Sequence, residues 1–203
     1  PFVSDHDNET FRVAATLDGA INVLWTWETS AAYSQNKYGI NVNDVLRDAY
    51  IGALTTGAFN PFGTAFTTHP NDQAVLDSII AEERLDGKTS LFTLEGHVTG
   101  EIAEINGNPV QLAVGGQYRY SDMDYQWGDD YNGPNGDGTN SGLLPPGLNG
   151  GNLMFLYGGP DYSGDRDVFA GFAELAIPIH ETLDVQLAAR YEDYGSGVNS
   201  FDP

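Results

Sequence analysis

The feature that most constrains the fold is an alternation of apolar and polar side chains, clearest in residues 183–192. Leu183, Val185 and Leu187 lie on one side of an extended chain, with Asp184 and Gln186 on the other. Similar alternation predicts six antiparallel β-strands at residues 11–19, 23–33, 91–102, 110–120, 168–177 and 183–192. In every strand the charged side chains share the less apolar face: Arg12, Asp18, Glu28, Glu95, Glu101, Arg119, Glu174, Asp184, Arg190 and Glu192. An all-β fold follows from this pattern.

The amino-acid composition excludes several classes of function. The 203 residues include 29 Asp or Glu against 8 Lys or Arg, which gives a formal charge of −21. Such a chain is a poor nucleic-acid binder, because phosphate contacts require clusters of Lys and Arg. It contains no Cys, so disulfides, thiolate metal sites and thiol nucleophiles are excluded.

The connections between the predicted strands are of two kinds. Three are short, near residues 18–22, 103–109 and 178–182, and two are long, at 34–90 and 121–167. Short turns at one end and long loops at the other are typical of outer-membrane barrels. A soluble sandwich also buries one face of each strand, so the alternation alone leaves both architectures open.

The first long connection is expected to contain short helices. Asn43 or Asp44 is a candidate cap for a helix reaching Leu54, and Asn71 or Asp72 for one at residues 73–84. Between them, the segment Phe-Asn-Pro-Phe-Gly at 59–63 predicts a turn.

Three stretches resemble the TonB-dependent outer-membrane receptors of Gram-negative bacteria. Residues 166–179 (RDVFAGFAELAIPI) followed by 183–194 (LDVQLAARYEDY) are similar to a barrel hairpin of that family. Residues 98–101 through 114–119 (VTGE to VGGQYR) are similar to a second hairpin. Residues 59–63 with 72–79 look like an extracellular loop segment of a large receptor subfamily.

The resemblance implies a segment of a transmembrane β-barrel of about 22 strands, with short turns in the periplasm and long loops outside the cell. The chain starts at Pro1 without Met and ends at Pro203 directly after a strand, so we expect a partial barrel domain without the plug. The implied partners are outer-membrane lipid, TonB through the plug region, and a small-molecule or oligosaccharide ligand. The implied function is TonB-energised uptake of a siderophore, a cobalamin-like cofactor or a glycan.

Two sets of side chains are candidates for contact with such a ligand. The polar face of the strands is expected to face the lumen, with Glu95, His97, Glu101, Arg119, Glu174 and Arg190. Aromatic side chains of the second long connection could stack on a sugar or an aromatic chelate: Trp127, Tyr131, Phe155, Tyr157 and Tyr162. The alternative for residues 153–157 is that they pack between loops or belong to a strand.

Metal binding and catalysis have weaker signals. Asp129, Asp130 and Asp137 are the best candidates for calcium, which prefers hard oxygen ligands, although solvated surface acids explain the same residues. The four histidines are scattered, and no serine has the context of a hydrolase nucleophile. The chain is therefore not expected to be an enzyme, and no cofactor other than calcium is expected.

Two other functions compete with transport. A soluble secreted β-domain could bind calcium or carbohydrate through its acidic loops, and its apolar face would then pack on a second sheet. A passive porin would share the barrel but is disfavoured by the loop motifs.

Overall fold

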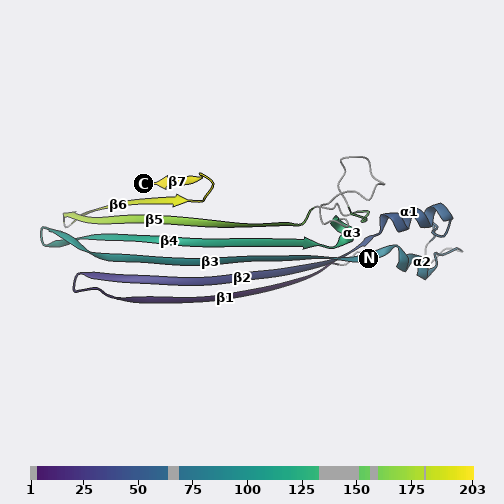
Figure 1. Ribbon diagram of the computed structural model, residues 1–203, viewed down its shortest axis with the longest axis horizontal. Helices are drawn as coiled ribbons and strands as arrows, with labels where there is room; N and C mark the ends of the chain where they lie inside the picture. Colours follow the sequence, from purple (N-terminus) through teal and green to yellow (C-terminus); the bar gives the residue numbers. More distant parts are fainter. Residues whose placement is uncertain (1–3, 64–68, 133–150, 156–159, 181) are drawn as a thin grey trace. The chain divides into compact units, whose positions relative to one another are not determined.

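The computed structural model describes residues 4–63, 69–132, 151–155, 160–180 and 182–203. Within them the chain forms one antiparallel sheet whose strand order follows the sequence, β1 to β7 (Figure 1). The strands are β1 (Ser4–Ala20), β2 (Trp25–Val45), β3 (Ile80–Ile105), β4 (Asn108–Trp127), β5 (Tyr162–His180), β6 (Leu183–Asp193) and β7 (Asn199–Asp202). The helices are α1 (Arg47–Thr56), α2 (Gln73–Ser78) and α3 (Asp129–Asn132). The all-β antiparallel prediction is confirmed.

The chain divides into two compact units, each built from three segments. We call the first the helical unit because it contains all three described helices; it comprises Pro1–Glu9, Lys37–Lys88 and Asp124–Ser163. The second, the strand unit, comprises Thr10–Asn36, Thr89–Met123 and Gly164–Pro203.

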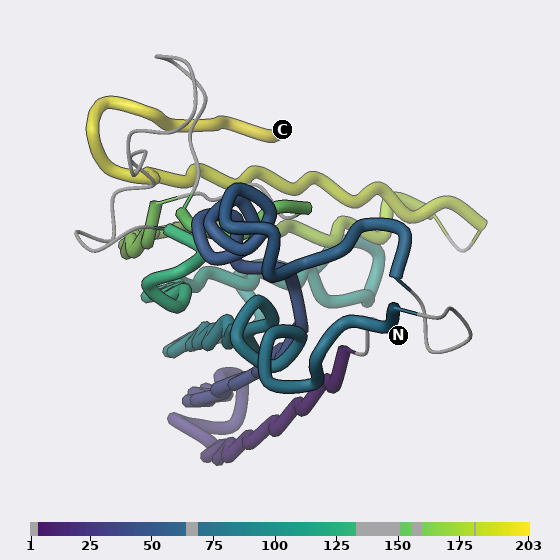
Figure 2. The backbone as a smooth tube through the Cα atoms, turned by 90° about the vertical axis from the view of Figure 1, so that its right-hand side faces the viewer, coloured from purple at the N-terminus to yellow at the C-terminus, as the bar shows by residue number. Residues whose placement is uncertain are grey.

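Hairpins build the strand unit. The turn between β3 and β4 consists of Asn106 and Gly107, both with positive φ (52° and 78°), which is the geometry that favours Asn-Gly in two-residue hairpins. Strand β5 pairs with β6 in a register that sets Phe172 opposite Arg190 and Leu175 opposite Leu187. After a turn at 194–198, β7 runs back along β6 towards the C-terminus (Figure 2).

One face of the strand unit leaves large apolar side chains uncovered by the described residues. Leu17 is 65 % exposed, Phe169 60 % and Leu187 56 %. The same face carries further exposed residues: Phe11, Val13, Leu94, Ile102, Val114 and Tyr191. All of these positions belong to the apolar side of the predicted alternation, whereas Val110, on the same side, is 5 % exposed.

The helical unit has the opposite character, with a small buried core and local hydrogen bonds. Ile79, Leu85 and Leu153 are buried, at 4–5 % exposure. Helices α1 and α2 lie near each other in both views (Figures 1 and 2). Between them, the backbone N–H of Asn60 donates a hydrogen bond to Oδ1 of Asn71 at 2.6 Å. No helix in the described ranges is long and apolar enough to cross a membrane.

The helix predictions are partly right. Asp72 caps α2 by accepting a hydrogen bond from the backbone of Ala74 at 3.0 Å, as expected, but α2 ends at Ser78 rather than at residue 84. The cap predicted at Asn43 or Asp44 is wrong, because α1 begins after Leu46 without a side-chain cap. Asp44 lies in β2, 1 % exposed, and accepts hydrogen bonds from the backbone of Val45 and Phe155.

The predicted long loops 34–90 and 121–167 are wrong at their ends. Residues 34–45, 80–90, 121–127 and 162–167 belong to β2, β3, β4 and β5, so the connections are 46–79 and 128–161. These strand extensions carry polar residues on both faces; in β3, Glu82 and Glu83 are neighbours and therefore lie on opposite faces. No alternation marks such a segment as a strand. The short strand β7 was missed for lack of length.

Candidate functional site

Three tyrosines form a row across four neighbouring strands of the helical unit. Tyr38 on β2 and Tyr125 on β4 meet edge to face, with ring centroids 5.7 Å apart. Tyr162 at the start of β5 stacks on Tyr125 at 4.7 Å and 20°. The rings can meet over β3 because residue 87 is glycine: a Cβ there would lie 2.3 Å from Tyr38 and 2.8 Å from Tyr125. We call Tyr38, Tyr125 and Tyr162 the tyrosine ladder.

A second aromatic pair lies just beyond the ladder in the sequence. Trp127, the last residue of β4, stacks on Tyr131 of α3 with centroids 3.9 Å apart and planes at 10°. The backbone N–H of Trp127 and the side-chain amide of Asn132 both donate to Asp161 at 2.8 Å. Asn132 is 1 % exposed, and its Oδ1 has no hydrogen-bond partner among the described residues.

Two carboxyl groups meet in the same unit. Glu83 of β3 is 9 % exposed and shares a side-chain hydrogen bond with Asp130 of α3. Burial, followed by the charge and hydrogen bond of Asp130 and the charge of Asp129, raises the pKa of Glu83 from 4.5 to about 7. The Glu83 carboxyl therefore remains protonated over part of the physiological pH range, and its O–H donates a hydrogen bond to Asp130.

The strand unit carries a polar network on the face opposite its exposed apolar side chains. Gln117 donates to Glu95 at 2.6 Å and accepts from Arg190 at 3.1 Å. The carboxylate of Glu192, which is 8 % exposed, forms ion pairs with Arg190 at 2.6 Å and with Arg119 at 3.3 Å. The guanidinium of Arg190 also lies 5.9 Å from the ring centre of Phe172.

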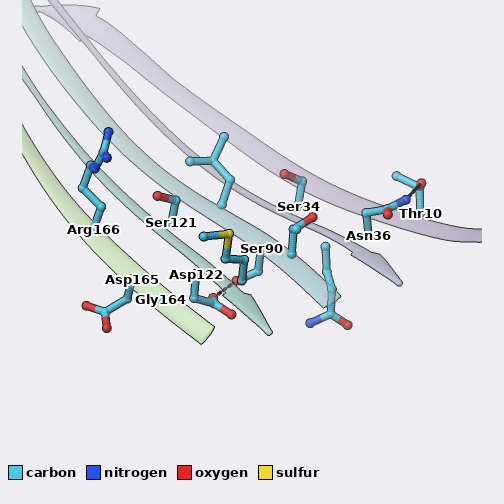
Figure 3. Close-up of a pocket in the computed structure, with 13 residues that line it drawn as sticks. Thr10, Ser34, Asn36, Ser90, Ser121, Asp122, Gly164, Asp165 and Arg166 are labelled. Carbon is cyan, nitrogen blue, oxygen red and sulfur yellow. Dashed lines mark hydrogen bonds between the residues drawn. The ribbon is translucent and has the colours of Figure 1, made fainter. Parts of the chain in front are cut away.

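A cavity of about 470 Å³ lies in the strand unit (Figure 3). Its lining comes from β1 to β5 and consists largely of short polar side chains, among them Thr10, Asn36, Ser90 and Asp122. Asn36 donates to Thr10 at 2.8 Å, and Ser90 donates to Asp122. Arg166 is the cationic residue of the lining. No sequence motif singled out this cavity.

The candidate lumen residues fall on the face that carries the network. Glu95, Arg119 and Arg190 belong to the network itself. His97 and Glu174 line a cavity of about 550 Å³ together with Glu95 and Arg190. Glu101 lies further along β3 and is exposed.

The candidate ligand-binding aromatics do not form a single cluster. Trp127 and Tyr131 stack on each other, whereas Tyr162 stacks on Tyr125 of the ladder. Phe155 is 62 % exposed, and its backbone N–H donates to Asp44 at 3.1 Å. Tyr157 lies outside the described residues.

The calcium prediction stays a prediction. Asp129 and Asp130 lie in α3, where Asp130 faces Glu83 rather than a third aspartate, and Asp137 lies outside the described residues. In the part of the chain that the structure describes, no three His, Cys, Asp or Glu side chains are placed to hold a metal ion.

Sequence reasoning missed Tyr38, Tyr125 and Glu83, all of which fell in predicted loops. The two-residue spacing of Tyr125 and Trp127 is a signal for one strand face that could have extended β4. The partnership of Tyr38 with Tyr125 has no local signal, since the two are far apart in the sequence.

Comparison with known proteins gives one family. The family model described as "TonB dependent receptor-like, beta-barrel" matches residues 1–203. No curated protein matches the chain.

Proposed function

The chain belongs to the TonB-dependent receptor β-barrel family, and on that premise we propose that it forms wall and outer mouth of a transporter that takes up a scarce nutrient. Members of this family are outer-membrane transporters of Gram-negative bacteria rather than enzymes, and they work with TonB and small ligands. The nutrient classes that we consider are siderophores, cobalamin-like cofactors and glycans.

The observation that carries the proposal is the match of the family model over the whole chain, together with the sorting of side chains in the strand unit. Its exposed apolar face, with Leu17, Phe169 and Leu187, fits contact with lipid. The opposite face, with the network of Glu95, Arg119 and Arg190, fits a water-filled lumen, where charged groups remain hydrated or paired.

The two units would have different roles in transport. In the strand unit, the lumen face would line the passage and contact a plug. In the helical unit, the tyrosine ladder and the Trp127–Tyr131 stack would contact the nutrient before it enters. Plug movement driven by TonB and the proton gradient would then release the nutrient into the periplasm.

The competing function, a soluble secreted β-domain that binds calcium or carbohydrate, requires a cover for the apolar face. The described residues form one sheet, and none of them covers that face. A protein that is extracted from cells and stays monomeric without detergent would overturn the transporter proposal.

The proposal is tested by comparing three strains: wild type, one lacking the receptor gene and one lacking TonB. Growth is measured separately with iron, cobalamin or carbon source limiting. We expect both deletions to cause the same growth defect on the same nutrient. A plasmid copy of the receptor should restore growth in the strain that lacks the receptor gene but not in the strain that lacks TonB. Receptor-dependent uptake that persists without TonB would contradict the proposal.

A further inference from the structure

The tyrosine ladder gives the helical unit an aromatic surface that spans β2 to β5. Tyr162, at its end, is 48 % exposed, so part of its ring is open to solvent although one side stacks on Tyr125. Trp127 stands two residues after Tyr125 on the same strand and therefore on the same face. Rings held by contacts with one another lose little conformational freedom when a ligand binds, which favours their use as a recognition surface.

The helical unit is poor in cationic side chains. The helical unit contains 15 Asp or Glu and four Lys or Arg. Lys37 and Lys88 are the sequence neighbours of Tyr38 and Gly87, so strand alternation sets them on the opposite face.

The two arginines of the unit are engaged elsewhere. Arg84 forms ion pairs with Asp7 at 3.1 Å and Asp86 at 2.8 Å. Arg47 is 5 % exposed and pairs with Asp48 at 3.2 Å. A net negative unit whose cations are paired or lie on the other face repels an anionic ligand rather than concentrating it.

The polar groups near the rings are instead hydrogen-bond acceptors and carboxyl groups that share a proton. Asp161 accepts a hydrogen bond from the backbone of Trp127, which stacks on Tyr131. Glu83 and Asp130 form a carboxyl pair that can both accept and donate. Groups of this kind bind hydroxyls, which are donors and acceptors at once.

We infer that the tyrosine ladder binds a neutral oligosaccharide, not an anionic ferric chelate. The apolar C–H face of a pyranose ring packs on an aromatic face, while its hydroxyls donate hydrogen bonds to carboxylate oxygens at the rim. The inference deepens the proposed function, on which it rests, by choosing glycans among the nutrient classes considered above.

The test measures binding by the intact detergent-purified receptor with isothermal calorimetry. The probes are mixtures of short neutral hexose and pentose oligosaccharides, oligouronates of matched length as their anionic counterparts, and ferric enterobactin as an anionic siderophore. We expect heat from a neutral mixture only. Tyr162→Ala should weaken that binding roughly tenfold, the effect of losing one stacking ring.

Two variants control for folding and for generic loss of a tyrosine. Tyr162→Phe keeps the ring and should recover the binding that Tyr162→Ala loses. Tyr191→Ala removes a tyrosine of similar exposure, 47 %, from the strand unit and should bind like wild type. Each variant is compared at equal amounts of receptor in the outer membrane.

The other outcomes overturn the inference. If the receptor binds oligouronates or ferric enterobactin but no neutral probe, the proposed substrate class is wrong. Loss of that binding in Arg166→Ala would place the site at the cavity of the strand unit. Neutral binding unaffected by Tyr162→Ala would contradict the ladder, and absence of binding to every probe would contradict both. Uptake of a bound oligosaccharide by cells lacking TonB would overturn the proposed function alone and leave the glycan inference standing.

Discussion

The two units use the same strands in different ways. In the strand unit, apolar residues such as Leu187 and Phe169 are among the most exposed, and buried polar groups such as Glu192 are paired with arginine. In the helical unit, a small core that includes Leu85 and Leu153 is buried, although Ile80 is 50 % exposed, and carboxyl groups as well as aromatic rings meet inside. The difference indicates two surroundings, lipid for the apolar face of the first unit and water for the second.

Strand length supports the same division. Strand β3 has 26 residues, whereas a strand needs only about ten to cross a membrane. The remainder must be stable in water, where a sheet gains from cross-strand contacts and covered faces rather than from lipid. The tyrosine ladder supplies such contacts within the helical unit.

The largest expected effect tests the lipid face of the strand unit. Leu187→Arg sets a charge on the apolar face of β6 and should cost about 2–4 kcal/mol if that position lies deep in the membrane. Gln186→Arg is the matched control on the opposite face, where Gln186 is 3.5 Å from Glu174 and a cation finds a carboxylate. Assembly is measured as the fraction of heat-modifiable, protease-resistant receptor in the outer membrane. Equal loss in both variants would contradict the assignment of faces.

The next effect tests whether the helical unit depends on its aromatic contacts. Gly87→Ala places a methyl group 2.3 Å from the Tyr38 ring, which must move, at a cost of about 1–3 kcal/mol for overpacking. The control is Gly171→Ala in β5, where no atom lies within 4 Å of the new methyl group. Thermal unfolding of the detergent-purified receptor should show a lower midpoint for the first variant only. A similar midpoint for both would mean that the ladder does not stabilise the unit.

The sequence allowed prediction of the strand unit and very little of the helical one, for a physical reason. Where one face contacts lipid, every second residue is constrained, and strands such as 110–120 and 183–192 can be read directly. In residues 80–88 one face is also buried, but its residues are Glu83, Leu85 and Gly87, so hydropathy does not alternate and the strand looks like a loop.

Long-range contacts set the rest of the helical unit. Asp44 has the residue type and position of a helix cap, yet it accepts from the backbone of Phe155 and lies buried in a strand. The candidate site was found only in part for the same reason. Trp127, Tyr131 and Tyr162 were identified as aromatic residues, but Tyr38 and Gly87, which complete the ladder, have meaning only once β2, β3 and β4 are paired.

A smaller effect concerns pH and the buried carboxyl pair of the helical unit. The folded state raises the pKa of Glu83 to about 7, so it retains a proton that the unfolded chain loses near pH 4.5. This contribution to stability is complete below about pH 4.5 and is lost as the pH rises through about 7. Each pKa unit corresponds to about 1.4 kcal/mol, and with screening by solvent we expect a loss on the order of 1–2 kcal/mol.

The measurement follows Trp127 fluorescence during thermal unfolding, in a receptor whose Trp25 and Trp27 are replaced by Phe. The helical unit should unfold at a lower temperature at about pH 8 than at about pH 5. Glu83→Gln should remove most of this difference. Glu82→Gln, at the exposed neighbouring position on the opposite face, should leave it intact. A pH dependence that survives in Glu83→Gln would show that another group is responsible.

The smallest expected effect tests how locally the helical unit is held together. Asp72→Ala removes the cap of α2, whose carboxylate accepts from Ala74, and should cost about 1 kcal/mol. Hydrogen exchange at the Ala74 amide should then accelerate about fivefold. Asp77→Ala, which instead removes the partner of Gln73 within the same helix, should leave the Ala74 amide protected. Because α2 lies in the water-exposed unit, neither variant should change assembly of the strand unit in the outer membrane. An assembly defect from Asp72→Ala alone would mean that the two units fold as one cooperative body, and the contrast between them would then describe their surfaces but not their stability.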